Sequence, residues 1–575
     1  MSDQHPVDPP AKDRLLIIGG TVAPYKSVQA EQDQLLRTFL SELDSQGGDA
    51  SGADPADSFW LDLDEPYHPF KAAPVHQHRA SQDKVTGLAE LILQKEAADL
   101  GIDSDIVTLE EILDSRWQLT DPGLYDGYTL VAVSTTYVPS TYLMAVLKAL
   151  RVPTSAKMFI GGPGASKVNH GALEDARFDY LLRTEAEGRF RLLLRHAQGH
   201  DVDLQVVPGL TWRADGALHR TEESTTHLNL DELPLPDFSK MSDLGGGRVL
   251  YESVRGCPYR CEFCDYPFLM GNTKFRFKSA QRIFEDWQMM HQTMGVTDIL
   301  CLDSLFTVPP RRLLEVCDLM VASGLNKKLR WGCYARANDL AKLEFAERMR
   351  EGGCEYVYVG LESGSDQVLK FMNKKASVDH NARAVANARQ VGIVTFGLFI
   401  SGFPGETPEM FAETRQFLRD SPPTLVSIHP WFPDSSEDTR VPIMMPDRIE
   451  RFAIDVEKPS SRKVTMWKHC TFREPLTVPW GMYWEHSGMD LQQAVDNVSL
   501  VVEDIYAREI AAVSEELFFP RTLDDVLTLF QRLGPDGLAD FYAGLTTAIH
   551  SDGETDLPGF CRRLGLQHRS ALATL

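Results

Sequence analysis

Three of the nine cysteines of the chain stand together in the stretch RGCPYRCEFCDYP, residues 255–267. Cys257, Cys261 and Cys264 have the spacing C-x3-C-x2-C, and thiolates bind both zinc and iron–sulfur clusters. Structural zinc takes four ligands, usually as two C-x-x-C pairs, and no second pair stands nearby in the sequence. Three thiolates on a four-iron cluster leave one iron open for a substrate or cofactor. The spacing favours the cluster, with a zinc-binding module or an electron-transfer protein as alternatives.

The other cysteines are scattered, as small buried hydrophobic residues often are. They are Cys301, Cys317, Cys333, Cys354, Cys470 and Cys561.

The 575 residues are 43% hydrophobic and 24% charged, which is typical of a globular protein with two to four domains. The sequence has no bilayer-length apolar run and no signal-like N-terminus, so we expect a cytoplasmic protein with no membrane partner. A net charge of −24 argues against nucleic acid as a partner.

Strand and helix patterns alternate in residues 12–205, which predicts a doubly wound, Rossmann-like sheet. Apolar runs begin at Arg14, Tyr128, Ala156 and Phe178, and STYLMAVLKALR (140–151) has a helical pattern. Ligands of such sheets bind at the carboxyl ends of the strands. The turns STTYVPST and GGPGAS stand at that edge, and their glycines allow a backbone to approach a ligand closely.

A segment rich in Pro and Gly, residues 206–245, is the expected linker to a second α/β domain, residues 246–440. Six strand candidates occur there, each followed by a helical pattern: RVLYESVRG, TDILCLDSLFTV, LRWGCYARAN, CEYVYVGLESGS, VGIVTFGLFISGFPGET and TLVSIHPWFP. This repeat predicts a partial (β/α)6 barrel, with its chemistry at the carboxyl ends of the strands. Residues 441–575 are expected to form a mainly helical C-terminal domain.

A C-x3-C-x2-C loop after the first strand of a partial barrel resembles the radical S-adenosylmethionine (SAM) superfamily. The resemblance implies that Cys257, Cys261 and Cys264 hold three irons of a 4Fe-4S cluster, while SAM chelates the fourth. An external electron donor such as flavodoxin or ferredoxin would reduce the cluster, and SAM would then be cleaved to methionine and a 5′-deoxyadenosyl radical.

Two further segments carry the same resemblance. GLESGSDQVLKFMNK (360–374) is similar to the fourth-strand element of these proteins, in which Glu362 and Ser363 would line the SAM pocket. GLFISGFPGET (397–407) is similar to the fifth-strand element that packs against adenine.

The second-strand segment, CLDSLFTV (301–308), departs from the glycine-rich GGE-type motif that holds the SAM amino group in many members. Asp303 and Ser304 stand in its place as substitutes. Arg336, after the third strand, would meet the SAM carboxylate. Phe263 corresponds to the aromatic residue often found between the last two cysteines.

A doubly wound domain before such a barrel resembles the cobalamin-dependent (class B) radical SAM methyltransferases. The resemblance implies that cobalamin binds at the carboxyl edge of the first sheet, in contact with Ser134, Thr135, Gly161, Gly162 and Gly164. The sequence lacks the D-x-H-x-x-G motif that gives cobalt a histidine ligand, so the lower axial ligand stays open. The class also implies that both sheets direct their carboxyl ends at a common cavity.

The resemblance implies methylation of an unactivated carbon or phosphinate phosphorus in a natural-product precursor, either a small molecule or a peptide. The layout and the segment YWEHSGM suggest the phosphinate P-methyltransferase type. His429, Trp431, Trp484 and His486 are candidates for the substrate pocket, with a tryptophan-rich core as the alternative for each. A non-methylating rearrangement or ring closure is the other enzymatic alternative.

Overall fold

The computed structural model describes residues 13–19, 88–108, 122–135, 150, 152–162, 165, 177–183, 185–223, 228–238, 248–268, 274–433, 439–466, 476–514, 527, 530–531 and 533–539. The chain divides into a first unit (1–63, 85–240 and 269–272) and a second unit (64–84, 241–268 and 273–575). None of the helices in the described stretches is both long and apolar enough to cross a bilayer.

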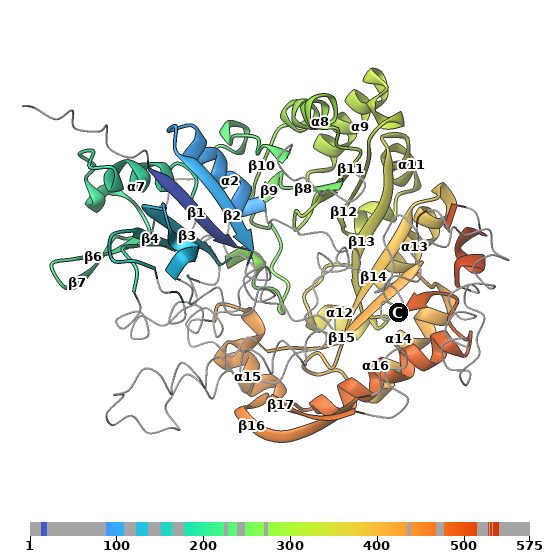
Figure 1. The fold of residues 1–575 in the computed structure, drawn as a ribbon. Helices are drawn as coiled ribbons and strands as arrows, with labels where there is room; N and C mark the ends of the chain where they lie inside the picture. The colour runs from blue at the N-terminus through green and yellow to red at the C-terminus, as the bar shows by residue number, and fades with distance from the viewer. Residues whose placement is uncertain are drawn as a thin grey trace, which may run out of the picture. The chain divides into compact units, whose positions relative to one another are not determined.

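The first unit is built on one seven-stranded sheet (Figure 1). Its strands are β1 (Arg14–Gly19), β2 (Asp103–Thr108), β3 (Leu130–Ser134), β4 (Lys157–Gly161), β5 (Tyr180–Leu182), β6 (Leu210–Ala214) and β7 (Ala217–Arg220), in the order β2-β1-β3-β4-β5-β6-β7. The first five strands are parallel, and helices α2 (Leu88–Ala98) and α7 (Arg189–Ala197) pack with them. The predicted doubly wound sheet is confirmed, because continuous apolar strands such as β3 are buried along their whole length. The predicted helix over 140–151 falls outside the described residues, apart from Leu150.

The expected linker over 206–245 is partly wrong, because its first part belongs to the sheet. β6 pairs antiparallel with β5, and β7 returns along β6. The turn between them is Asp215–Gly216, with φ values of 51° and 76°, the conformation that a two-residue hairpin requires. The alternating pattern of LTWRADGALHR around this Asp-Gly pair is a hairpin signal that the Pro and Gly content of the segment obscures.

The second unit contains a seven-stranded parallel sheet whose strands follow one another in chain order. They are β8 (Arg248–Tyr251), β11 (Asp298–Cys301), β12 (Arg330–Ala335), β13 (Cys354–Glu362), β14 (Val394–Ser401), β15 (Leu425–Pro430) and β18 (Val513–Ser514). The connecting helices are α8 (Ala280–Met294), α9 (Pro310–Ser323), α10 (Ala337–Leu340), α11 (Leu343–Glu351), α12 (Asp366–Phe371), α13 (Val378–Val391) and α14 (Pro408–Asp420). The six predicted strands of the partial barrel are confirmed, and β18 adds a seventh.

Local signals set the ends of these helices. α8 begins after Ser279, whose hydroxyl accepts from the Arg282 N–H, and ends at Gly295 in the left-handed region. α9 begins with Pro310 and ends at Gly324, also left-handed. Such caps satisfy the unpaired groups of helix ends, so each helix stops where the chain must turn back to the sheet.

The described part of residues 441–575 contains the expected helices and also a long ribbon that the pattern does not predict. Helices α15 (Pro446–Phe452) and α16 (Leu491–Tyr506) flank strands β16 (Asp455–Met466) and β17 (Leu476–Glu485), which pair antiparallel. Figure 1 shows this ribbon curving along α16, and the two are in contact. Register shifts in β16 break its alternation, which explains why the strand pattern is hard to recognise.

In the described part of the second unit, two clusters of buried side chains join the barrel to the segments that follow it. One joins aromatic residues of β13 and β14, including Tyr356, Tyr358 and Phe396, to Leu527 and Phe530 from the C-terminal part of the chain. The other joins the loops after β14 and β15 to the segment 441–495. The segments after the barrel are therefore packed against it and complete its core.

Candidate active site

The three clustered cysteines lie in the loop that follows β9 (Val254–Arg255), directly after β8. β9 pairs antiparallel with β10 (Arg276–Phe277), so a small hairpin frames the loop at the carboxyl end of the first barrel strand. The loop opens at Gly256, whose φ is 76° and where a Cβ would stand 2.5 Å from the Lys274 carbonyl oxygen. Only glycine tolerates both conditions, and it lets the chain turn sharply into the cysteines.

The thiols of the loop share one electrostatic environment. Cys257 is buried, and Cys261 and Cys264 are partly buried. Burial raises the pKa of all three thiols, and that of Cys264 reaches about 12. Each ionised thiol would also repel the others, while the positive charges of Arg336 and Lys374 lower the pKa of Cys257 and Cys261.

This donor set fits a four-iron cluster. Thiolates are the usual ligands of such clusters, and nearby cations favour the thiolate form. Across the residues that the structure describes, no three His, Cys, Asp or Glu side chains are grouped so that they could hold one metal ion. A cluster does not require such a group, since each thiolate binds a different iron.

Asp303 and Ser304, which follow β11, hold the strand that leads into the cysteines. The buried carboxylate of Asp303 accepts from the backbone N–H groups of Ser253 (2.6 Å) and Val254 (2.8 Å), and from the Ser253 hydroxyl. The Ser304 hydroxyl donates to the Gly256 carbonyl oxygen at 3.1 Å. Burial raises the pKa of Asp303 to about 6. Both side chains therefore bond to the segment 253–256, and their predicted role at the SAM amino group stays a prediction.

Glu362 ends β13 and lies beside the cysteine loop. Its φ of 62° is in the left-handed region, which non-glycine residues rarely adopt. Its Oε1 accepts from the Lys374 Nζ at 2.5 Å. Burial alone would lower the pKa of Lys374, but the charges of Glu362 and Cys261 outweigh it and the net pKa is raised. The Ser363 hydroxyl, in contrast, lies 3.0 Å from the Thr414 Oγ1 and is directed at α14.

Two more predicted residues contact the loop from other strand ends. The Arg336 guanidinium, after β12, lies 3.6 Å from the centroid of the Tyr259 ring and donates to the Lys374 carbonyl oxygen at 2.9 Å. Phe263 packs edge-on against Phe403, after β14, with 6.4 Å between ring centroids. The strand ends after β12, β13 and β14 therefore all reach the cysteine loop, as the barrel topology predicts.

The turn after β14 contains a buried acid. Glu406 accepts from the Gly402 N–H through Oε2 at 2.5 Å, while its Oε1 is buried without a hydrogen-bond partner. Burial raises the pKa of Glu406 to about 8, so the group is mainly neutral near pH 7.

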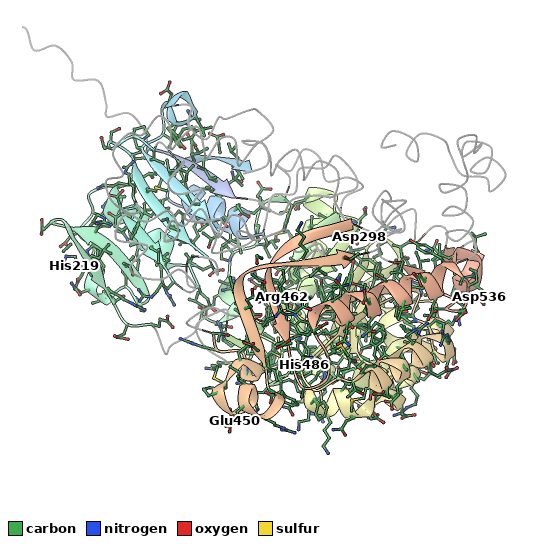
Figure 2. The ribbon with its side chains drawn as sticks, turned by 90° about the horizontal axis from the view of Figure 1, so that it is seen from below. His219, Asp298, Glu450, Arg462, His486 and Asp536 are labelled. Atoms are coloured by element: carbon green, nitrogen blue, oxygen red, sulfur yellow. The ribbon has the colours of Figure 1, made fainter. Side chains whose placement is uncertain are left out.

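His486 ties the C-terminal segment to the same turn. Its Nδ1 accepts from the backbone N–H groups of Gly405 and Gly488, so the proton is on Nε2, which donates to the Gly402 carbonyl oxygen at 3.0 Å. Burial lowers the pKa of His486 to about 4. Figure 2 shows this residue among the packed side chains of the second unit.

The other substrate-pocket candidates are mostly part of the core. Trp431 and Trp484 are buried in one cluster, and the ring of Trp484 stacks on that of His486 at 5.4 Å. His429, on β15, has its Nε2 at 2.9 Å from the Ser427 hydroxyl. Both tryptophans therefore belong to a tryptophan-rich core, which is the alternative to a substrate pocket.

In the first unit, the predicted contact residues meet where β3 and β4 end. Thr135 follows Ser134, and both its N–H and its hydroxyl donate to the Gly161 carbonyl oxygen at 2.8 Å. Gly162 has a φ of 106°, and neither glycine places a side chain at this edge. The buried Thr135 hydroxyl also accepts from the Ala165 N–H at 3.0 Å, so it is engaged within the turn, and its contact with cobalamin stays a prediction. Gly164 falls outside the described residues.

Two described histidines of this unit, His196 and His219, lie away from that edge. The His196 Nδ1 is 2.8 Å from the Tyr180 hydroxyl at the start of β5. His219 stacks on Trp212, which pairs with Tyr180, so it also lies toward the amino end of the strands. Neither of these two histidines is therefore a candidate for an axial ligand of cobalt.

Sequence reasoning missed three ionisable residues that have little exposure, Arg312, Lys374 and Glu406. Arg312, on α9, donates to the Phe306 carbonyl oxygen at 2.9 Å and lies next to Ser253. Lys374 and Glu406 stand inside the two segments that resemble family elements, and their position there is a signal that could have singled them out. Arg312 has no such signal, because an arginine within an amphipathic helix is normally exposed.

The comparisons with known proteins agree with this arrangement. Residues 251–418 match the profile of the Radical SAM superfamily. An uncharacterized methyltransferase of Pyrococcus horikoshii is 27% identical over 345 residues, which is 58% of this chain and 69% of that protein. An anaerobic magnesium-protoporphyrin IX monomethyl ester cyclase of Cereibacter sphaeroides is 25% identical over 313 residues, 52% of this chain and only 50% of that protein.

Two solved structures share the fold. The radical S-adenosylmethionine methyltransferase TsrM from Kitasatospora setae, with tryptophan and a SAM analog bound, gives a TM-score of 0.51 at 18% identity, over 60% of this chain and 70% of that one. The cobalamin-dependent S-adenosylmethionine radical enzyme OxsB, with aqua-cobalamin and S-adenosylmethionine bound, gives 0.51 at 14% identity, over 97% and 76%. Together with the cysteine loop at the first strand end, the profile match shows that the chain contains a domain of the radical SAM superfamily.

Proposed function

We propose that this chain is a cobalamin-dependent radical SAM methyltransferase that methylates an unactivated centre of a small-molecule or peptide substrate. The observation that carries the proposal is the cysteine loop after β8 and β9, with three charged side chains beside it. Glu362 and Arg336 come from neighbouring strand ends, and Lys374 comes from the turn after α12. The named methyltransferases among its relatives support the reaction class.

The residues of the second unit would divide the work of holding the cofactors. Cys257, Cys261 and Cys264 would bind three irons, and the charges of Glu362 and Arg336 suit the amino and carboxylate groups of SAM. When bound, the cluster and SAM supply a radical that abstracts hydrogen, and cobalamin supplies the methyl group. The packing of Phe263 on Phe403 would keep the loop in place and exclude water from it.

In the first unit, Ser134, Thr135, Gly161 and Gly162 would contact cobalamin. The fold shared with the cobalamin-dependent enzyme OxsB supports this placement. Further parts of the proposal are a natural-product precursor as substrate, phosphinate phosphorus as one possible methyl acceptor, and a cytoplasmic electron donor of the flavodoxin or ferredoxin class.

A radical ring closure without methyl transfer is the second candidate function. It is favoured by one observation: the similarity to the anaerobic magnesium-protoporphyrin IX monomethyl ester cyclase over about half of each chain. Both candidates need the same cluster site. They differ in whether a methyl group from SAM is transferred to the substrate.

The first experiment tests the cluster. The protein is purified anaerobically, and its absorption spectrum and metal content are recorded beside those of a Cys257→Ala/Cys261→Ala/Cys264→Ala variant. Iron–sulfur absorption that disappears in the variant is expected. A colourless wild-type protein loaded with zinc would refute the proposal.

The second experiment separates the two candidates. Reconstituted enzyme is incubated with SAM, methylcobalamin and a reductant, and the products are quantified. We expect both 5′-deoxyadenosine and S-adenosylhomocysteine. Deoxyadenosine without methyl transfer would favour ring closure, and failure to retain cobalamin would remove the first unit from the proposal.

A further inference from the structure

The turn after α12, residues 372–375, holds the cysteine loop on both sides of Cys261. The Glu262 N–H donates to the Met372 carbonyl oxygen at 2.9 Å. On the other side, the Asn373 side-chain amide donates to the Arg260 carbonyl oxygen at 2.6 Å. The peptide groups that flank Cys261 are therefore both bound by neighbouring residues of one turn.

The turn itself is held in an unusual shape. Asn373 and Lys375 have φ values of 52° and 57°, in the left-handed region. The Arg336 guanidinium donates to the Lys374 carbonyl oxygen at 2.9 Å, and the Asn338 amide donates to that of Lys375 at 3.0 Å. Left-handed backbone is unfavourable for residues other than glycine and persists only where the surroundings hold it. The position of Lys374 is therefore determined by the fold.

Lys374 places a positive charge beside the thiols. Its side chain is 13% exposed, its Nζ lies 2.5 Å from the Glu362 Oε1, and it stands 5.8 Å from the centroid of the Phe263 ring. Charges with so little water around them are weakly screened. Burial raises the pKa of the Cys261 thiol, and among the neighbouring charges Lys374 has the largest effect and lowers this pKa.

We propose that Lys374 holds a fixed positive charge beside Cys261, and that this charge raises the reduction potential of the cluster bound there. The inference rests on the proposed function, since it requires that cluster. Reduction adds one electron, delivered by a donor of the ferredoxin or flavodoxin class, and so makes the cluster more negative. A fixed cation next to one of its thiolates stabilises the reduced form, and net charge around a cluster is one determinant of its potential.

The test uses the full chain, reconstituted and assayed anaerobically. Lys374→Met removes the charge and keeps much of the side-chain length, and Lys374→Arg keeps the charge. Lys370→Met is the matched control, an exposed lysine on α12. Iron per protein is measured first, and each SAM-free protein is then titrated with dithionite while the cluster absorption and the paramagnetic resonance signal are followed.

At a given potential, the ratio of reduced to oxidised cluster should fall at least tenfold in K374M, a shift of about 59 mV for a one-electron couple. K374R and K370M should match the wild type. A K374M protein with full iron content and the wild-type potential would overturn the inference while leaving the proposed function intact. A wild-type chain that binds no iron would instead remove the proposed function.

K374M could also load less iron than the wild type. In that case Glu362→Gln decides, again without SAM. Removing the negative charge beside Cys261 should raise the potential, the opposite of the effect expected for K374M. An unchanged potential in an iron-loaded E362Q protein would show that these charges do not tune the cluster.

Discussion

Replacing Glu406 with glutamine is expected to stabilise the protein at alkaline pH. The carboxyl group is buried in the turn after β14, and burial raises its pKa to about 8, from a usual value of 4.5. Only backbone N–H groups of Gly402 and Phe403 oppose this, and the nearby His486 ring is neutral. The folded protein therefore holds a proton that the unfolded chain releases, so stability falls as the pH rises from 4.5 to about 8.

The magnitude follows from these two pKa values. One pKa unit corresponds to about 1.4 kcal/mol, so ionising Glu406 costs the folded state on the order of 5 kcal/mol. Between about pH 6 and about pH 8.5, linkage predicts that the wild type loses about 2.5 kcal/mol relative to E406Q. Glutamine is nearly isosteric and still accepts the Gly402 N–H, so the variant keeps the turn but loses the titration.

The assay follows thermal and urea unfolding of both proteins across this pH range. The stability of E406Q relative to the wild type should increase steadily as the pH rises. Glu413→Gln, at an exposed position of helix α14 that follows the turn, should not show this increase. Difference infrared spectra at neutral pH should also show a protonated carboxylic acid band that E406Q reduces. Parallel pH profiles of E406Q and the wild type would refute the reasoning.

Three further predictions concern the turn and the cysteine loop. Burial lowers the pKa of His486 to about 4 from 6.5, so the stability of the protein falls as the pH drops from 6.5 to about 4. In His486→Gln the free energy of unfolding should depend less on pH in this range. An unchanged pH dependence would contradict this. Gly256→Ala places a Cβ 2.5 Å from a carbonyl oxygen, so this variant should bind well under half the iron that the wild type binds. Gly295→Ala, where a Cβ meets open space, should keep its iron. Equal iron content in both variants would argue against the strained loop. Asp303→Asn disturbs the hydrogen bonds to Ser253 and Val254, so it should lower the free energy of unfolding by about 1–3 kcal/mol. It should also speed the release of iron to a chelator. Release at the wild-type rate would show that Asp303 does not support the loop.

Regular alternation of strands and helices made the barrel predictable from the sequence. β11 to β15 are short apolar runs, and each is followed by an amphipathic helix that returns the chain to the same edge of the sheet. The ribbon of β16 and β17 and the hairpin of β6 and β7 could not be recognised in the same way. Bulges interrupt the first, and turn-rich composition hides the second.

The sequence by itself determined the cysteine loop, because its three ligands are separated by only a few residues and their spacing is a local property. It also indicated Glu362, Arg336 and Phe263, which follow recognisable strand patterns. Only the tertiary structure decided how Asp303, Lys374 and Glu406 are used. Their partners are distant in the chain, so the direction of each side chain depends on which strand ends meet. The protonation state of a buried ionisable group depends on those neighbours, and no pattern along the sequence identifies them.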